Sequence, residues 1–122
     1  MMRNPDAKHL DFEDLIGVIP ENPKLLPSNV DMMLERSGKF LVGEWKRPHE
    51  KISLGQEILL KALARQQNFI VLLITGDTDE GMYIEKFERL RADGSYEIKG
   101  KNASEFKQWL VKWYGWVNKH DF

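Results

Sequence analysis

The stretch NVDMMLERSGKFLVGEWK, residues 29–46, decides the fold of this chain. It contains two extended, apolar-rich runs, residues 29–35 and 40–46, separated by the four residues RSGK. Ser37 and Gly38 stand at the centre of this separator, where a Ser-Gly pair suits the tight turn of a β-hairpin. We therefore expect two antiparallel strands joined at this turn.

A turn at Ser37 and Gly38 also fixes which residues face one another. The numbers of paired residues then add up to 75, and Asp31 lies opposite Glu44. Opposed side chains have Cβ atoms about 5 Å apart, and two like charges there are destabilising unless a cation compensates them. Lys46 follows Glu44 by two residues and points to the same face of its strand. The hairpin is thus predicted to place two carboxylates and an amine together.

The opposite face of this hairpin is predicted to be a core face. Its residues are all apolar, which is typical of a strand pair that packs against a helix: Val30, Met32, Leu34, Leu41 and Trp45.

The segments on either side of the hairpin predict an α/β domain. Residues 6–19 show amphipathic helical spacing, and three prolines follow them. A second helix is predicted from Ser53, a plausible N-cap, to about Gln67, with an apolar stripe of Ile58, Leu59, Ala62 and Leu63. Residues 69–74, FIVLLI, have the pattern of a strand buried on both faces. Strand, helix and strand would then form a parallel crossover.

The C-terminal third predicts a second hairpin and a last helix. Residues 83–90 and 96–99 flank the turn sequence ADGS. The last helix carries an aromatic stripe whose spacing suits packing on the sheet, with a dimer contact as the alternative: Phe106, Trp109, Trp113 and Trp116. The expected fold is one mixed β-sheet flanked by helices in a single domain over residues 1–122, an α-β-β-α-β core followed by a hairpin and a helix.

Composition limits the chemistry. The 122 residues include no cysteine, so only oxygen and imidazole ligands are available to a metal, which favours Mg²⁺ or Mn²⁺. The net charge of −1 means that binding to nucleic acid must depend on a local basic patch. No run of about eighteen apolar residues and no signal-peptide pattern occurs, so we expect a cytoplasmic protein without a membrane partner.

The hairpin residues resemble a known superfamily. Asp31, followed after thirteen positions by Glu44-Trp45-Lys46, resembles the motif of the PD-(D/E)xK phosphodiesterases, in particular the resolvase, VRR-NUC and RecB-like nucleases. The resemblance implies a restriction-endonuclease-like fold and Mg²⁺-dependent hydrolysis of DNA. It assigns the metal to Asp31, Glu44 and Trp45, and the positioning of the attacking water to Lys46.

Two further residues come from the same resemblance. RecB-like members carry a glutamine in the helix after the lysine, which Gln56 matches, although Leu60 stands where they have a tyrosine. Resolvase-like members use a glutamate from the first helix, for which Glu13 is the candidate, with Asp14 and Asp11 next to it. Gln56 also fits a capping box with Ser53, and both interpretations stay open here.

The flanking charged residues allow two interpretations. Arg47, His49 and Lys51 follow the motif strand and would suit contacts to phosphates, or they form a solvated loop. Asp77, Asp79 and Glu80 follow the buried strand and are interpreted as a solvated loop, since they lack the spacing of a calcium loop.

We therefore expect a Mg²⁺-dependent deoxyribonuclease, an endonuclease of recombination, repair or phage DNA processing. Its partner is DNA, and a homodimer would help a small domain address two strands. Two alternatives remain: a non-catalytic relative that binds nucleic acid or a protein, and an interaction module that docks a partner through the tryptophan-rich helix.

Overall fold

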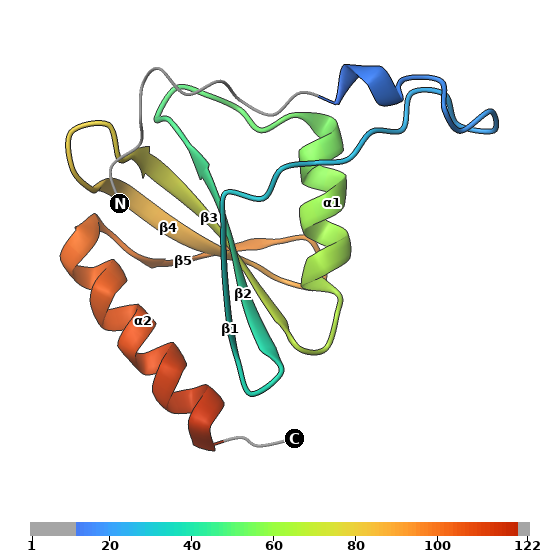
Figure 1. Ribbon diagram of the computed structural model, residues 1–122. Coiled ribbons are helices and arrows are strands. Elements are labelled where there is room, and N and C mark those ends of the chain that lie inside the picture. Colours follow the sequence, from blue (N-terminus) through green and yellow to red (C-terminus); the bar gives the residue numbers. More distant parts are fainter. Residues whose placement is uncertain (1–11, 120–122) are drawn as a thin grey trace.

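The computed structural model describes residues 12–119 of the chain. Figure 1 shows a five-stranded sheet with one long helix on each side. The elements in chain order are the 3-10 helix η1 (Glu13–Leu15), β1 (Met32–Arg36), β2 (Lys39–Lys46), α1 (Leu54–Ala64), β3 (Phe69–Asp77), β4 (Tyr83–Leu90), β5 (Tyr96–Gly100) and α2 (Asn102–Lys119). The predicted α/β class is confirmed.

The strands lie side by side in the order of the sequence, β1-β2-β3-β4-β5. β2 and β3 are parallel and are connected through α1, whereas all other neighbours are antiparallel. The crossover predicted between the hairpin and residues 69–74 is therefore confirmed. Because β2 and β3 run in the same direction, their carboxyl ends meet at one edge of the sheet.

The first hairpin has the predicted register. Arg36 pairs with Lys39 and Met32 pairs with Gly43, so the paired numbers add up to 75 along the whole ladder. Ser37 and Gly38 both have positive φ, 55° and 77°, as a two-residue turn of this kind requires. The Glu35 side chain accepts a hydrogen bond from the Gly38 amide at 2.9 Å, which adds a further contact across the turn.

The two faces of the sheet carry separate cores. The core between the sheet and α2 contains eight buried residues, five from the strands and three from α2, with Met32 and Trp45 packed against them: Leu41, Leu72, Ile74, Ile84, Phe87, Phe106, Trp113 and Val117. The face toward α1 buries Val42, Leu60, Val71 and Leu90. The predicted core face of the hairpin is thus correct for Leu41, Met32 and Trp45. It is wrong for Val30 and Leu34, which are exposed: Val30 lies before β1, and Leu34 lies on β1, the edge strand of the sheet.

Helix α1 begins at the predicted cap but presents a different stripe to the sheet. Leu60 is its buried residue, and Leu63 and Ala64 pack beside it at helical spacing. Ile58 is 60% exposed. The predicted apolar stripe therefore has the right period, but the face of α1 that packs on the sheet is rotated from it by part of a turn. The crossover connection sets which face meets the sheet, and the spacing of apolar residues does not encode that.

The helix predicted over residues 6–19 is wrong where the structure describes it. Residues 6–11 lie outside the described part, and between residue 12 and β1 only η1 forms. Residues 13–31 are all exposed. An amphipathic helix depends on a surface that buries its apolar side, and α1 and α2 already cover the two faces of the sheet. Figure 1 accordingly shows this segment as an arm that projects past α1.

The second hairpin and the last helix follow the prediction closely. Arg91 and Ser95 close the turn between β4 and β5, with the Arg91 amide donating to the Ser95 carbonyl at 2.8 Å. On α2, Phe106 and Trp113 are buried as predicted and Trp109 packs against them, but Trp116 is 43% exposed and Val117 takes its place in the core. Among the described residues, no helix is long and apolar enough to cross a membrane.

Candidate active site

The hairpin motif lies beside two adjoining hollows at the carboxyl ends of β2 and β3. The first has a volume of about 570 Å³ and extends to the loop after β3, and the second, of about 420 Å³, lies toward the start of α1. Both hollows are lined by the same five residues, Asp31, Glu44, Trp45, Lys46 and Glu50. The motif residues are thus accessible to a ligand from either side.

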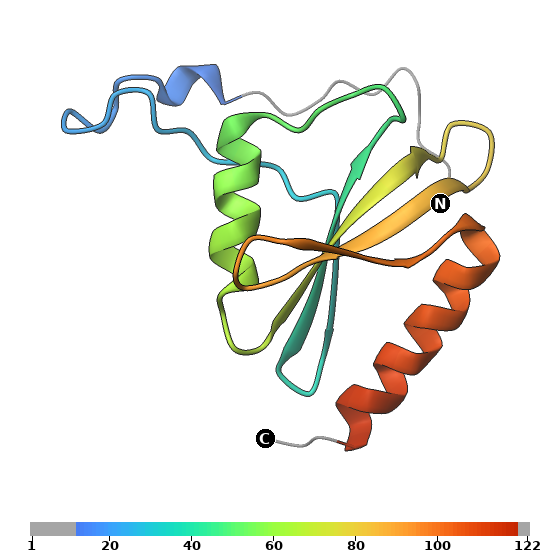
Figure 2. The same cartoon turned by 180° about the vertical axis from the view of Figure 1, so that it is seen from behind.

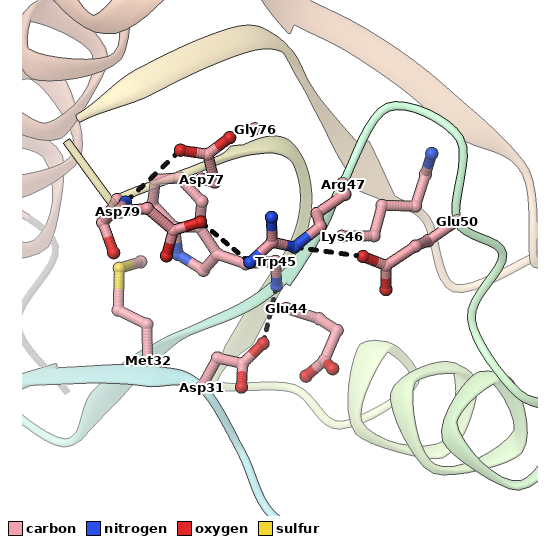
Figure 3. A pocket seen from close by; sticks show the side chains of 11 residues that line it. Asp31, Met32, Glu44, Trp45, Lys46, Arg47, Glu50, Gly76, Asp77 and Asp79 are labelled. Carbon is pink, nitrogen blue, oxygen red and sulfur yellow. Dashed lines mark hydrogen bonds and ion pairs between the residues drawn. The ribbon is translucent and has the colours of Figure 1, made fainter. Parts of the chain in front are cut away.

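Asp31 immediately precedes β1 and is held by the neighbouring strand. Its Oδ2 accepts a hydrogen bond from the backbone amide of Trp45 at 2.9 Å. The pair Met32 and Gly43 is the first of the ladder, so Asp31 stands at the next position, beside Glu44. Figure 3 shows both carboxylates close together at one side of the hollow. The predicted meeting of these two side chains is observed.

Glu44 is a buried carboxylate. It pairs with Leu73 in the sheet interior and is 9% exposed, and its Oε2 has no hydrogen-bond partner in the described structure. Burial raises the pKa of Glu44 to about 7; a hydrogen bond from Gln56 opposes this rise, and the negative charge of Asp31 adds to it. An oxygen that is buried, poorly hydrated and beside a second carboxylate has a strong requirement for a positively charged partner.

Gln56 connects the motif to the chain before it. Its side-chain amide donates to the Asn29 carbonyl at 3.2 Å and also contacts Glu44. The Ser53 hydroxyl caps α1 by accepting from the backbone amide of Gln56 at 3.1 Å. The cap therefore uses the backbone of Gln56, while its side chain reaches toward Asn29 and Glu44, so the helix start positions a residue of the site.

Lys46 shares the face of Glu44 by strand alternation, as predicted, but its amine lies apart from the acids. Among the described ion pairs, none joins Lys46 to Asp31 or Glu44. Figure 3 shows the lysine side chain extended away from the two carboxylates. A lysine stem has four rotatable bonds, so the amine can turn toward a phosphate or a water in the same hollow.

The three basic residues after the motif are placed differently. Arg47 reaches over the first hollow, where it pairs with Asp79 at 2.8 Å and with Glu50 at 3.4 Å. Lys51 lines the second hollow. His49 is exposed and lines neither hollow. Arg47 and Lys51 are therefore positioned for contact with a ligand of the site, and His49 is not.

The end of β3 and the loop after it, which the sequence predicts to be solvated, bring two acidic residues to this site. Asp77 and Asp79 line the first hollow together with the motif, and the Asp77 side chain accepts from the Asp79 amide at 3.3 Å. The sequence held a usable signal, because Asp77 ends a strand parallel to β2 and such strands finish at the same edge.

Two further predicted site residues, Glu13 and Trp45, are placed differently from the two carboxylates. Glu13 lies on η1, is exposed, and is absent from the lining of both hollows. The indole of Trp45 packs edge-on against Phe106 at 6.4 Å in the α2 core. Its backbone carbonyl is the only oxygen that Trp45 has to offer a metal.

The donor chemistry of the site fits a hard cation. Two carboxylates converge, one with an unpartnered buried oxygen, and oxygen donors of this kind are those that Mg²⁺ and Mn²⁺ prefer. Within residues 12–119, no group of three or more acidic or histidine side chains is placed to hold one ion. A cation here would complete its coordination with backbone oxygen and water, as Mg²⁺ commonly does.

No family model, no curated protein and no solved structure matches this chain.

Proposed function

We propose that this protein is a Mg²⁺-dependent nuclease that hydrolyses DNA phosphodiester bonds, with a restriction-endonuclease-like arrangement of its core. The observation that carries the proposal is the meeting of Asp31 with the buried, partly unpartnered carboxylate of Glu44. Such a pair is unfavourable without a cation, since burial and like charge both act against ionisation.

Asp31, Glu44 and the Trp45 carbonyl are the groups that would hold the ion. When bound, Mg²⁺ supplies Lewis-acid activation of the phosphate and lowers the pKa of a coordinated water. At neutral pH part of the Glu44 population carries a proton, and a divalent cation would displace that proton as it binds.

The remaining residues would act on the phosphate and the nucleophile directly. The amine of Lys46 would orient the attacking water and stabilise the charge that develops on the phosphate. Arg47 and Lys51 would hold phosphates on either side of the bond that is cut. Gln56 would keep Glu44 in place through its amide, because it bridges this carboxylate to the Asn29 carbonyl.

The test is cleavage of plasmid, linear, single-stranded and four-way-junction DNA with Mg²⁺ or with EDTA. We expect activity only with Mg²⁺, and a loss of at least about a hundredfold in Glu44→Gln, Asp31→Asn and Lys46→Ala. Glu35→Gln is the matched control, since Glu35 lies on the same hairpin but at its turn, outside both hollows. Equal cleavage rates for the wild type and Glu44→Gln would overturn the proposed site, and no cleavage by the wild type under any condition would leave the fold as a non-catalytic binding module.

A further inference from the structure

The end of the sheet opposite the carboxylate pair carries a third hollow, and its lining is basic. Its volume is about 420 Å³, and it lies between the end of α1, the start of β3 and the end of β4. Figure 2 shows the β4–β5 turn beside the lower half of α1 at this end. We name it the basic hollow for the three arginines that line it, Arg65, Arg89 and Arg91.

The charges around the basic hollow are not balanced by the fold. Glu97 is the only acid in its lining, and it already contacts both Arg91 and Lys99. The nearby Asp93 is held in the turn by Ser95, with hydrogen bonds of 2.9 and 2.6 Å. Four cations, Arg65, Arg89, Arg91 and Lys99, thus stand near two carboxylates in a chain whose net charge is −1. The basic hollow therefore carries an excess of positive charge.

Two observations show that these positive charges are only partly compensated. The Nε of Arg89 is buried and has no hydrogen-bond partner among the described residues. The pKa of Lys99 is lowered, first by burial and then by the positive charges of Arg89 and Arg91. Like charges held this close destabilise the isolated fold, and an anion bound between them would relieve the repulsion.

The basic hollow and the candidate active site lie at opposite ends of one strand. Phe69, the first residue of β3, lines the basic hollow, and Asp77, its last, lines the first hollow of the site. Eight steps along a strand span about 26 Å. Glu44 and Arg89 also project from opposite faces, because Glu44 aligns through Leu73 with Glu88, the neighbour of Arg89.

We propose that the basic hollow binds the phosphate backbone of a nucleic acid at a point separate from the one that is cut. The inference rests on the proposed nuclease function for the identity of the anion. Arginine favours phosphate because its planar donors pair with two oxygens at once. A separation of about 26 Å corresponds to roughly eight base pairs of duplex, so one long or branched DNA could touch both places.

The experiment measures binding without cleavage. Fluorescence anisotropy of a labelled 30-base-pair duplex in EDTA gives Kd across a series of salt concentrations. Removing one cation that binds a phosphate lowers the slope of log Kd against log salt by about 0.9, so Arg89→Gln/Arg91→Gln should lower it by about 1.8. The exposed Arg65→Gln should lower it by about 0.9 without affecting the buried part of the sheet.

The matched control removes two cations elsewhere. Lys24 and Lys112 are exposed and line none of the hollows described, so Lys24→Gln/Lys112→Gln should leave the slope unchanged. Slopes equal to wild type in both arginine variants would overturn the proposal. Because no divalent cation is present, this result is independent of whether the protein cleaves DNA with Mg²⁺.

Discussion

Asp31 Oδ2 accepts a hydrogen bond from the Trp45 amide at 2.9 Å, across the two strands of the first hairpin. This bond ties the residue before β1 to the residue after Glu44. Asp31 is thereby held beside Glu44, although it lies outside the regular ladder. The fold therefore keeps the buried Glu44 carboxylate close to a second acid, and the cost of ionising Glu44 can be measured as a change in the free energy of unfolding with pH.

We expect the stability of the cation-free protein to fall as the pH rises through the raised pKa of Glu44. Below pH 4.5 the group is protonated in both the folded and the unfolded state. Between 4.5 and about 7 it ionises in the unfolded state but not in the folded state, so the free energy of unfolding decreases. Above about 7 the full penalty is present, which for a shift from 4.5 to about 7 amounts to roughly 3 kcal/mol.

The measurement is urea unfolding in EDTA at pH 5.5 and pH 8. Glu44→Gln should remove most of the pH difference and be more stable than wild type at pH 8. Adding Mg²⁺ at pH 8 should stabilise the wild type, by about 2.7 kcal/mol at a hundred times its Kd, and leave Glu44→Gln unchanged. An identical dependence of stability on pH in the wild type and the variant would show that the pKa of Glu44 is not raised in the folded protein.

The two roles of the α1 start can be separated by mutation. Gln56→Ala removes the amide that contacts Asn29 and Glu44 but keeps the backbone amide that Ser53 caps. We expect a roughly tenfold to hundredfold loss of activity with little change in melting temperature. Ser53→Ala should leave activity nearly unchanged and lower the free energy of unfolding by about 1 kcal/mol. Equal activity losses in both variants would mean that Gln56 affects activity only by stabilising the start of α1, and not through its contact with Glu44.

Arg47 is held over the first hollow by Asp79 and Glu50, and a substrate phosphate would compete with these acids. Exposed ion pairs are worth about 0.2–1 kcal/mol, which corresponds to at most about fivefold in affinity. Asp79→Asn should therefore tighten DNA binding by up to about fivefold, and Arg47→Gln should weaken it. Glu85→Gln, an exposed acid on β4 with the same change of charge, is the control. Equal tightening in both acid variants would indicate only a change of net charge.

The hairpin shows how much of this site the sequence could predict. The Ser-Gly turn and the strict alternation of a strand are local rules, and they placed Asp31 beside Glu44 correctly. The lysine amine illustrates the limit, because alternation gives the face of a side chain and not its rotamer. The contribution of Asp77 and Asp79 depends on where a parallel strand ends, which is set by contacts between distant segments.

The first helix marks a second limit. Residues 12–19 have helical spacing, but whether such a segment folds depends on an uncovered apolar surface elsewhere in the molecule. Here α1 and α2 already occupy both sheet faces, so only the turn Glu13–Leu15 forms. The same reasoning explains the rotation of the α1 stripe toward Leu60. Local sequence patterns predicted the elements, but which of them pack depends on which helices cover the two faces of the sheet.

The tryptophan stripe of α2 divides into a core residue and a surface residue, and a stability measurement distinguishes them. Trp113 is 6% exposed, so Trp113→Ala should lower the free energy of unfolding by about 3–5 kcal/mol. Trp113→Phe should lower it much less, because the indole N–H has no hydrogen-bond partner in the described structure and the substitution therefore removes no hydrogen bond. Trp116 is 43% exposed and lies under the Lys39 amine at 4.0 Å from its ring centroid, a contact worth about 1 kcal/mol or less.

Trp116→Ala should therefore shift the melting temperature only slightly in a monomeric protein. Light scattering at several concentrations provides the second readout. A homodimer held by this face would show a lower mass and a large, concentration-dependent loss of stability in Trp116→Ala, because burial of an indole at a subunit contact contributes far more than an exposed cation–π pair. An unchanged mass together with a small shift would assign Trp116 to the surface of a single chain.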